Sequence, residues 1–315
     1  MKLKKKFAGK WIVFLLLAFA PIAGCDGGGG EGSVSPNPSG SGVISGTATK
    51  GPVSGATITA WAINANGAKG TRIASAQTDG QGNFSIPMGN HAGPVMLQMS
   101  EGTYLDEANG SQMSMHPNDV MTCVIPSMPA GSTVNGIQIT PLTSMAQSMA
   151  QNMSGGMSEA NITQANKAMG QYFGLNDILA TRPMDPIVNG SGTSATQGMR
   201  NYGMTIAAMS QYAKNIGMPH SSGMVTVMMN DASDSGMDGI MTGQGGMGGG
   251  MMGRTQIEMG EGMMDATIMP DYAGTRGLSE AMAQFINSPM NKSGLTVQDM
   301  QDLMSKLSAS NGQIQ

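Results

Sequence analysis

The pattern of hydrophobic and polar positions divides the 315-residue chain into three parts. A basic start with a short apolar run comes first. It is followed by short segments in which apolar and polar residues alternate, and then by segments whose apolar residues recur every three to four positions. Alternation is typical of strands with one buried face, and the longer period is typical of amphipathic helices. The sequence therefore predicts an α+β protein in which the strands precede the helices.

The alternating part covers residues 42–140 and is divided by turn residues into short segments. Within 56–63, Ile58 and Ala60 fall on one face, and Trp61 falls on the other. The strand-like segments are 43–49, 56–63, 72–77, 83–87, 95–99, 120–125 and 134–140. Short strands separated by regular turns predict an antiparallel β-sandwich over residues 42–140.

Residues 141–315 have the period of helices and predict a methionine-rich α-helical domain. Thr140 can cap a first helix that has Pro141 at its first position. Further helices are expected at 158–174, 195–216, 278–286 and 296–307. Glycine and methionine dominate residues 235–262, which predicts a disordered insertion because so little of it can be buried.

Residues 2–25 have the pattern of a cleaved export signal. Five lysines precede an apolar run that is too short to span a bilayer and that ends on small residues. The sequence Ile22-Ala23-Gly24-Cys25 resembles the lipobox of bacterial lipoproteins, in which the cysteine is lipidated and becomes the first residue of the mature chain. The resemblance implies a signal peptide at 1–24 and lipidation of Cys25. The Gly-, Ser- and Pro-rich residues 25–41 then predict a flexible tether.

Acyl chains on Cys25 would hold the protein at a membrane surface without spanning it. The folded part would face the periplasm or the cell surface. Asp26 after the cysteine is the inner-membrane retention signal of enteric bacteria, but this rule does not carry over to other lineages, and we favour the outer membrane. An ordinary secreted protein cut nearby and an uncleaved anchor are the alternatives.

Two segments carry a resemblance to a known family. They are Gly51-Pro-Val-Ser-Gly-Ala-Thr-Ile-Thr-Ala60 and Thr78-Asp-Gly-Gln-Gly-Asn-Phe-Ser-Ile86. Together they make residues 42–100 resemble the carboxypeptidase regulatory-like domain, a transthyretin-like β-sandwich with an inward aromatic residue at the position of Phe84. The family is typically an accessory or binding module without catalytic residues of its own. The resemblance implies a non-catalytic binding or scaffolding module, with a glycan or a protein as its partner.

Composition narrows the range of partners and activities. The chain has 16 basic and 20 acidic residues, and five of the basic ones lie in the signal, so the mature chain is acidic and nucleic acid is not expected as a partner. None of the three histidines stands near a nucleophile in a recognisable motif, so we predict no catalytic residues and no enzymatic activity. The paired carboxylates Asp106 and Glu107 are expected to be charged surface.

The 34 methionines suggest an alternative function, soft-metal binding. Methionine sulfur suits Cu(I). The densest group is Met247, Met251, Met252, Met259, Met263 and Met264. A second candidate is Met113-Ser-Met-His116, although in a strand Met113 and Met115 would share one face and His116 would point away. Methionines at helical core positions are explained more simply as core filling, so copper remains the alternative and no cofactor is otherwise expected.

Two further features of the sequence are explained by ordinary structural roles. Asp231-Ala-Ser-Asp-Ser-Gly236 begins like a calcium loop, but Thr242 stands where an EF-hand requires glutamate, so a solvated acidic turn is expected. Cys123 has no partner for an internal disulfide once Cys25 is lipidated. A buried, inert thiol is expected, with a reactive thiol or an intermolecular bridge as the alternatives.

Overall fold

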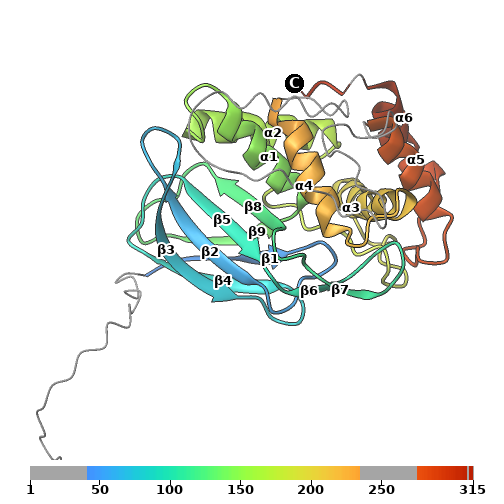
Figure 1. Ribbon diagram of the computed structural model, residues 1–315, viewed down its shortest axis with the longest axis horizontal. Helices are drawn as coiled ribbons and strands as arrows, with labels where there is room; N and C mark the ends of the chain where they lie inside the picture. Colours follow the sequence, from blue (N-terminus) through green and yellow to red (C-terminus); the bar gives the residue numbers. More distant parts are fainter. Residues whose placement is uncertain (1–40, 235–274, 311, 315) are drawn as a thin grey trace, which may run out of the picture. The chain divides into compact units, whose positions relative to one another are not determined.

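Nine strands precede six helices in the computed structural model, which describes residues 41–234, 275–310 and 312–314 (Figure 1). This order confirms the predicted α+β class. The predicted signal, almost all of the tether and the glycine/methionine insertion lie outside the described residues. Within these ranges, no helix has both the length and the hydropathy needed to cross a membrane.

The strands form two main sheets and one small hairpin. The first sheet has the order β4 (Asn83–Gly89), β1 (Gly42–Ala48), β9 (Thr133–Ile139). The second has the order β3 (Lys69–Gln77), β2 (Thr57–Ile63), β5 (Val95–Ser100), β8 (Val120–Ile125). The hairpin pairs β6 (Thr103–Leu105) with β7 (Gln112–Ser114). We call residues 42–139 the two-sheet region.

One strand pair departs from the predicted antiparallel arrangement. β9 runs parallel to β1, whereas the other neighbouring strands in the described sheets are antiparallel. The chain passes from the second sheet to the first between β8 and β9, and it enters β9 in the same direction as β1. At Gly46 a Cβ atom would lie 1.8 Å from the carbonyl oxygen of Ile137, so only glycine permits this approach of β1 to β9.

The facing sides of the two sheets share one hydrophobic core. Ile44 and Phe84 of the first sheet are buried in it with Ile58 and Leu97 of the second. The predicted common face of Ile58 and Ala60 is the inward face of β2, because both side chains are completely buried. Each large aliphatic side chain buried in this way contributes about 1.5–3 kcal/mol.

The helices follow the strands. They are α1 (Pro141–Asn152), α2 (Glu159–Tyr172), α3 (Gln197–Asn215), α4 (Ser222–Asp231), α5 (Thr275–Ile286) and α6 (Gln301–Ala309), with single 3₁₀ turns at Ala232–Asp234 and Gln298–Met300. The predicted start of α1 is confirmed, because Thr140 caps it in a capping box and Pro141 occupies its first position. α4 was not predicted, since its β-branched and methionine-rich sequence carries little helical periodicity. We call residues 141–310 the helical region.

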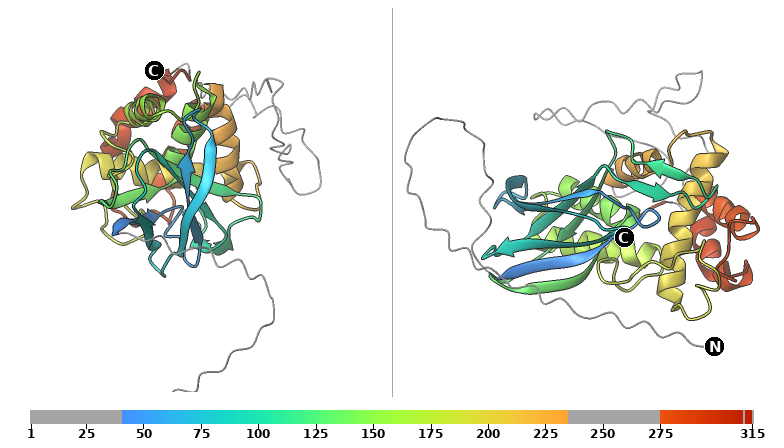
Figure 2. Two further views of the ribbon diagram at one scale, coloured as in Figure 1. Left: turned by 90° about the vertical axis from the view of Figure 1, so that its left-hand side faces the viewer. Right: turned by 90° about the horizontal axis from the view of Figure 1, so that it is seen from below.

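The helical region packs against the outer face of the second sheet (Figure 2). α1 lies against β8, and Met96 and Val124 of the sheet belong to the hydrophobic core of the helices. Hydrogen bonds add to this contact, because Ser144 accepts from the amide of Thr122 at 2.8 Å. The described strands and helices belong to one compact unit.

Cys123 lies in β8 and is completely buried in the core between the sheets. Burial raises the pKa of its thiol far above the ordinary value, with a smaller contribution from Asp177. The thiolate is the reactive form of cysteine, so this thiol is inert in the folded protein.

Candidate functional site

Side chains from both regions meet in a buried polar cluster around Lys50. The Nζ atom of Lys50 lies 2.9 Å from Oε2 of Glu107 and 3.1 Å from Oγ of Ser221, and it also donates to Ser210. The side chains of Lys50 and Glu107 are 0% and 2% exposed. We call the following residues the Lys50 cluster: Lys50, Tyr104, Asp106, Glu107, Ser210 and Ser221.

Two turns of the two-sheet region place the charged groups of the cluster. Lys50 follows β1 in a turn where Gly51 has a φ of 61° and where a Cβ atom would lie 2.4 Å from the carbonyl oxygen of Leu105. Only glycine allows that approach. Asp106 accepts the backbone N–H groups of Ala108 and Asn109, at 3.0 and 3.1 Å, and so fixes the turn between β6 and β7. The expectation that Asp106 and Glu107 lie on the surface is wrong, because both are buried.

The helical region supplies two hydroxyl groups to the same cluster. Ser210 on α3 donates to Oε2 of Glu107 at 2.5 Å. Ser221, directly before α4, donates to Oδ2 of Asp106, and its Oγ atom lies 3.1 Å from the hydroxyl of Tyr104. The Ser221 hydroxyl makes no capping bond to α4, although serine is a preferred residue at that position. Bonds between the two regions therefore take precedence over a local cap.

The charges of the cluster keep Lys50 protonated. Burial alone lowers the pKa of this ammonium, but Glu107, followed by Tyr104 and Asp106, outweighs it and raises the pKa above the ordinary 10.5. The ring of Tyr104 adds a cation–π contact, with Nζ 5.1 Å from the ring centroid. A protonated lysine is neither a nucleophile nor a general base. The hydrogen bonds and the ion pair of the cluster join two parts of the molecule.

A second buried carboxylate binds the start of α4. Asp119, just before β8, accepts from Oγ of Ser222 at 2.6 Å and from Oγ1 of Thr226 at 2.9 Å. A negative charge at the N-terminus of a helix is favourable because the backbone N–H groups there are not used within the helix. Asp106 and Asp119 thus tie α4 to the two-sheet region at two points.

Two histidines lie next to these carboxylates. The ring centroids of His116 and His220 are 6.0 Å apart, with the rings inclined by 52°. The amide of His116 donates to Oγ of Ser222 at 3.4 Å, and His220 comes directly before Ser221. The sequence singled out Met113-Ser-Met-His116 but not His220, because no local pattern relates residues about a hundred positions apart. The assumption of a single strand also fails, since β7 ends at Ser114.

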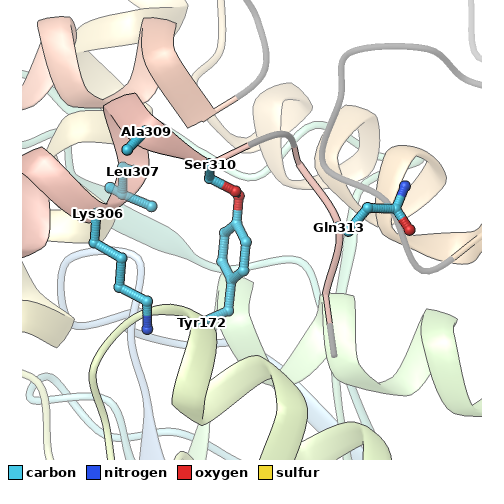
Figure 3. Close-up of a pocket in the computed structure, with 6 residues that line it drawn as sticks. All are labelled: Tyr172, Lys306, Leu307, Ala309, Ser310 and Gln313. Atoms are coloured by element: carbon cyan, nitrogen blue, oxygen red, sulfur yellow. The ribbon is translucent and has the colours of Figure 1, made fainter.

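A shallow pocket of about 290 Å³ lies elsewhere, where α6 meets the end of α2 (Figure 3). It is lined by Tyr172, Lys306, Leu307, Ala309, Ser310 and Gln313. The hydroxyl of Tyr172 lies 3.1 Å from Oγ of Ser310, and Lys306 donates to the carbonyl of Gln171. Burial raises the pKa of Tyr172 to about 12. None of the residues that line this pocket is a histidine, a cysteine, an aspartate or a glutamate.

The remaining predicted site residues fall into two groups. Cys25 and the six methionines of the copper candidate, Met247 to Met264, lie outside the described residues. Asp231 is not in a solvated turn as expected, because it ends α4 and is completely buried. In the described ranges, no three His, Cys, Asp or Glu side chains come together in a group that could hold a metal ion.

Comparison of the sequence with known proteins found no significant match among protein-family models or curated proteins. The functional argument therefore rests on the chain itself.

The Lys50 cluster makes a direct prediction for stability. Replacing Lys50 with methionine leaves Glu107 charged and buried without its partner, which costs about 3–5 kcal/mol in the free energy of unfolding. Chemical denaturation measures this loss. Lys50→Met combined with Glu107→Leu removes both charges and should recover part of it. Lys167→Met on the exposed side of α2 is the matched control and should change stability by less than about 0.5 kcal/mol. Equal stability of Lys50→Met and Lys167→Met would contradict the assignment.

The loss of stability in Lys50→Met should also depend on pH. Because the folded protein raises the pKa of Lys50, its contribution is complete below the unfolded value of 10.5 and is lost as the pH rises through the folded value. The difference in unfolding free energy between the wild type and Lys50→Met should therefore stay constant up to about pH 10 and shrink above it. Denaturation curves from pH 7 to 11.5 test this, and a difference that grows at alkaline pH would refute it.

Proposed function

We propose that the chain is a membrane-anchored envelope lipoprotein that acts as a non-catalytic binding or scaffolding module. The observation that carries this proposal is the Lys50 cluster. Its charged groups are buried and bonded to one another, so they hold the two regions together rather than face a substrate. A module that presents a surface to a partner benefits from such rigidity, because less conformational entropy is lost on binding.

We also propose that the two-sheet region is a transthyretin-like sandwich, and that the helices form a methionine-rich domain after it. Two sheets with a common core support this architecture. The inward aromatic residue implied by the family resemblance is matched by Phe84, which is buried in β4. The turn before it is fixed by Asp79, which accepts from the amides of Gln81 and Asn83 at 2.8 and 2.9 Å.

A glycan is the partner that the surface favours. Trp61 is half-buried on the outer face of β2, where part of its side chain packs against the core of the helices, and its buried Nε1 atom has no hydrogen-bond partner among the described residues. Nζ of Lys69 lies 4.4 Å from the centroid of its ring and donates to Oε1 of Gln98 at 3.1 Å. A sugar that displaces the Lys69 ammonium from the ring could stack on Trp61 and bond to Lys69 and Gln98, and stacking together with hydrogen bonds suits the flat, hydroxylated face of a sugar.

Lipidation is the first test of this function. In native cells, mass spectrometry of the mature protein should find an N-terminus at Cys25 that carries a diacylglycerol and an amide-linked acyl chain. Cys25→Ser should move the protein from the membrane fraction to the soluble fraction, because several acyl chains are needed for stable anchoring. An unprocessed, acyl-free N-terminus on membrane-bound protein would overturn the proposal.

Glycan binding is the second test. Isothermal titration of the full mature protein in detergent with soluble peptidoglycan fragments and neutral oligosaccharides should detect binding. Trp61→Ala should weaken it about 3- to 10-fold, because a stacked aromatic ring contributes about 0.5–1.5 kcal/mol. Val188→Ala, at an exposed apolar residue, is the control and should leave affinity unchanged. Binding that is insensitive to Trp61→Ala would exclude this face as the site.

A further inference from the structure

The spacing of His116 and His220 fits a shared metal ion. Two imidazoles that each bind the same ion through a nitrogen at about 2 Å have ring centroids about 5–6.5 Å apart. The observed separation is 6.0 Å. Both rings are half-buried, so they are shielded from bulk water but remain within reach of a small ion.

The nitrogen atoms of these rings are largely unused. Nδ1 of His220 is buried and has no hydrogen-bond partner among the described residues. A buried nitrogen without a hydrogen-bond partner requires an explanation, and a bound ion would provide one. Nδ1 of His116 accepts from the amide of Asn118 at 3.4 Å, a distance at which the hydrogen bond is weak and does not fix the tautomer of the ring.

Two methionines, Met113 and Met218, contact residues that lie near this pair in the structure. The hydroxyl of Tyr104 contacts Sδ of Met113 at 3.8 Å and Oγ of Ser221, the residue after His220, at 3.1 Å. The Cε atom of Met218 lies 2.8 Å from the position that a Cβ atom would take on Gly223, in the first turn of α4. Two thioether side chains therefore lie near the residues that follow His220.

The set of donors selects the metal. Hard cations need several oxygen ligands, but Asp119 already accepts from Ser222 and Thr226 with its two oxygens, and Asp106 accepts from Ser221 and from backbone amides. No third His, Cys, Asp or Glu completes a site with the histidines in the described part of the chain. Imidazole together with thioether suits Cu(I), which is stable with two or three ligands.

Charge around the site also favours a cation. Three buried carboxylates, those of Asp106, Glu107 and Asp119, face the buried ammonium of Lys50 and the exposed one of Lys214, which donates to the carbonyl of Ala108 at 3.0 Å. One negative charge remains in excess, and it raises the local concentration of cations.

We propose that His116 and His220, with the thioether of Met113 or Met218 as a third ligand, bind one Cu(I) ion. His116 belongs to the two-sheet region and His220 to the helical region, so the ion bridges the two regions beside the Lys50 cluster. The site is separate from the proposed glycan-binding face at Trp61. It shares His116 and Met113 with the second copper candidate of the sequence and has no residue in common with the first, the glycine/methionine segment.

The test uses the full mature protein, with Cu(I) delivered anaerobically against a chromophoric Cu(I) chelator. The wild type should retain copper, and His116→Gln with His220→Gln should lose one equivalent and weaken that affinity by about 100-fold or more. His91→Gln is the matched control, because His91 is the remaining histidine and its Nε2 atom lies 3.4 Å from the carbonyl of Pro94. Copper retained equally by the double variant and by the control would overturn the proposal.

A variant with leucine in place of the methionines of the glycine/methionine segment separates the two copper candidates. It carries Met247, Met251, Met252, Met259, Met263 and Met264 as leucine. It should keep the histidine-dependent equivalent of copper. Loss of all copper from this variant would place binding in that segment and exclude the histidine site.

A spectroscopic readout covers the case in which the histidine variants fold poorly. X-ray absorption of the Cu(I)-loaded wild type should show two nitrogen ligands at about 2.0 Å and one sulfur at about 2.3 Å. Met113→Leu and Met218→Leu, measured separately, identify which thioether binds the copper.

NMR spectra of the wild type titrated with silver(I) provide a second readout. The ring resonances of His116 and His220 should shift, and those of His91 should not. A spectrum with sulfur ligands alone, or a shift of His91 alone, would refute the site. Either failure would leave lipid anchoring and glycan binding untouched.

Discussion

The ion pair between Lys50 and Glu107 is the interaction on which the arrangement of the two regions depends. An ammonium group that is completely buried is tolerated only if charges and hydrogen-bond acceptors surround it. Here the surrounding groups come from the β6–β7 hairpin, from α3 and from the residue before α4. The two regions must therefore be correctly placed for the charge to be stable at all.

Several local features follow from this requirement. Gly51 lets the turn that carries Lys50 approach the backbone of Leu105. Ser221 gives up the cap of α4 and bonds to Asp106 instead, and Asp119 stabilises the start of the same helix from the two-sheet region. As a result, His116 and His220 are brought together from distant parts of the chain. The proposed copper site is thus a consequence of the way in which α4 is held.

Sequence reasoning succeeded where the information is local. The cap at Thr140, the common face of Ile58 and Ala60 in β2 and the start of α2 after Ser158 were all predicted, because residues a few positions apart determine them. It failed where the partner is distant. Asp106 and Glu107 look like surface charges until Lys50 is placed beside them, and nothing in a single sequence indicates the parallel pairing of β9 with β1. A buried ion pair leaves no periodic trace in a sequence, and neither does a pair of histidines from two regions.

Native-state hydrogen exchange tests most directly whether the Lys50 cluster joins the two regions into one cooperative unit. The measurement compares the opening free energies of amides in β1 and β5 with those of amides in α3 and α4. If the cluster couples the regions, the most protected amides of both open with the same free energy, and Lys50→Met lowers both together. Helices that exchange several kcal/mol more easily than the strands, with a gap unchanged by Lys50→Met, would contradict the account.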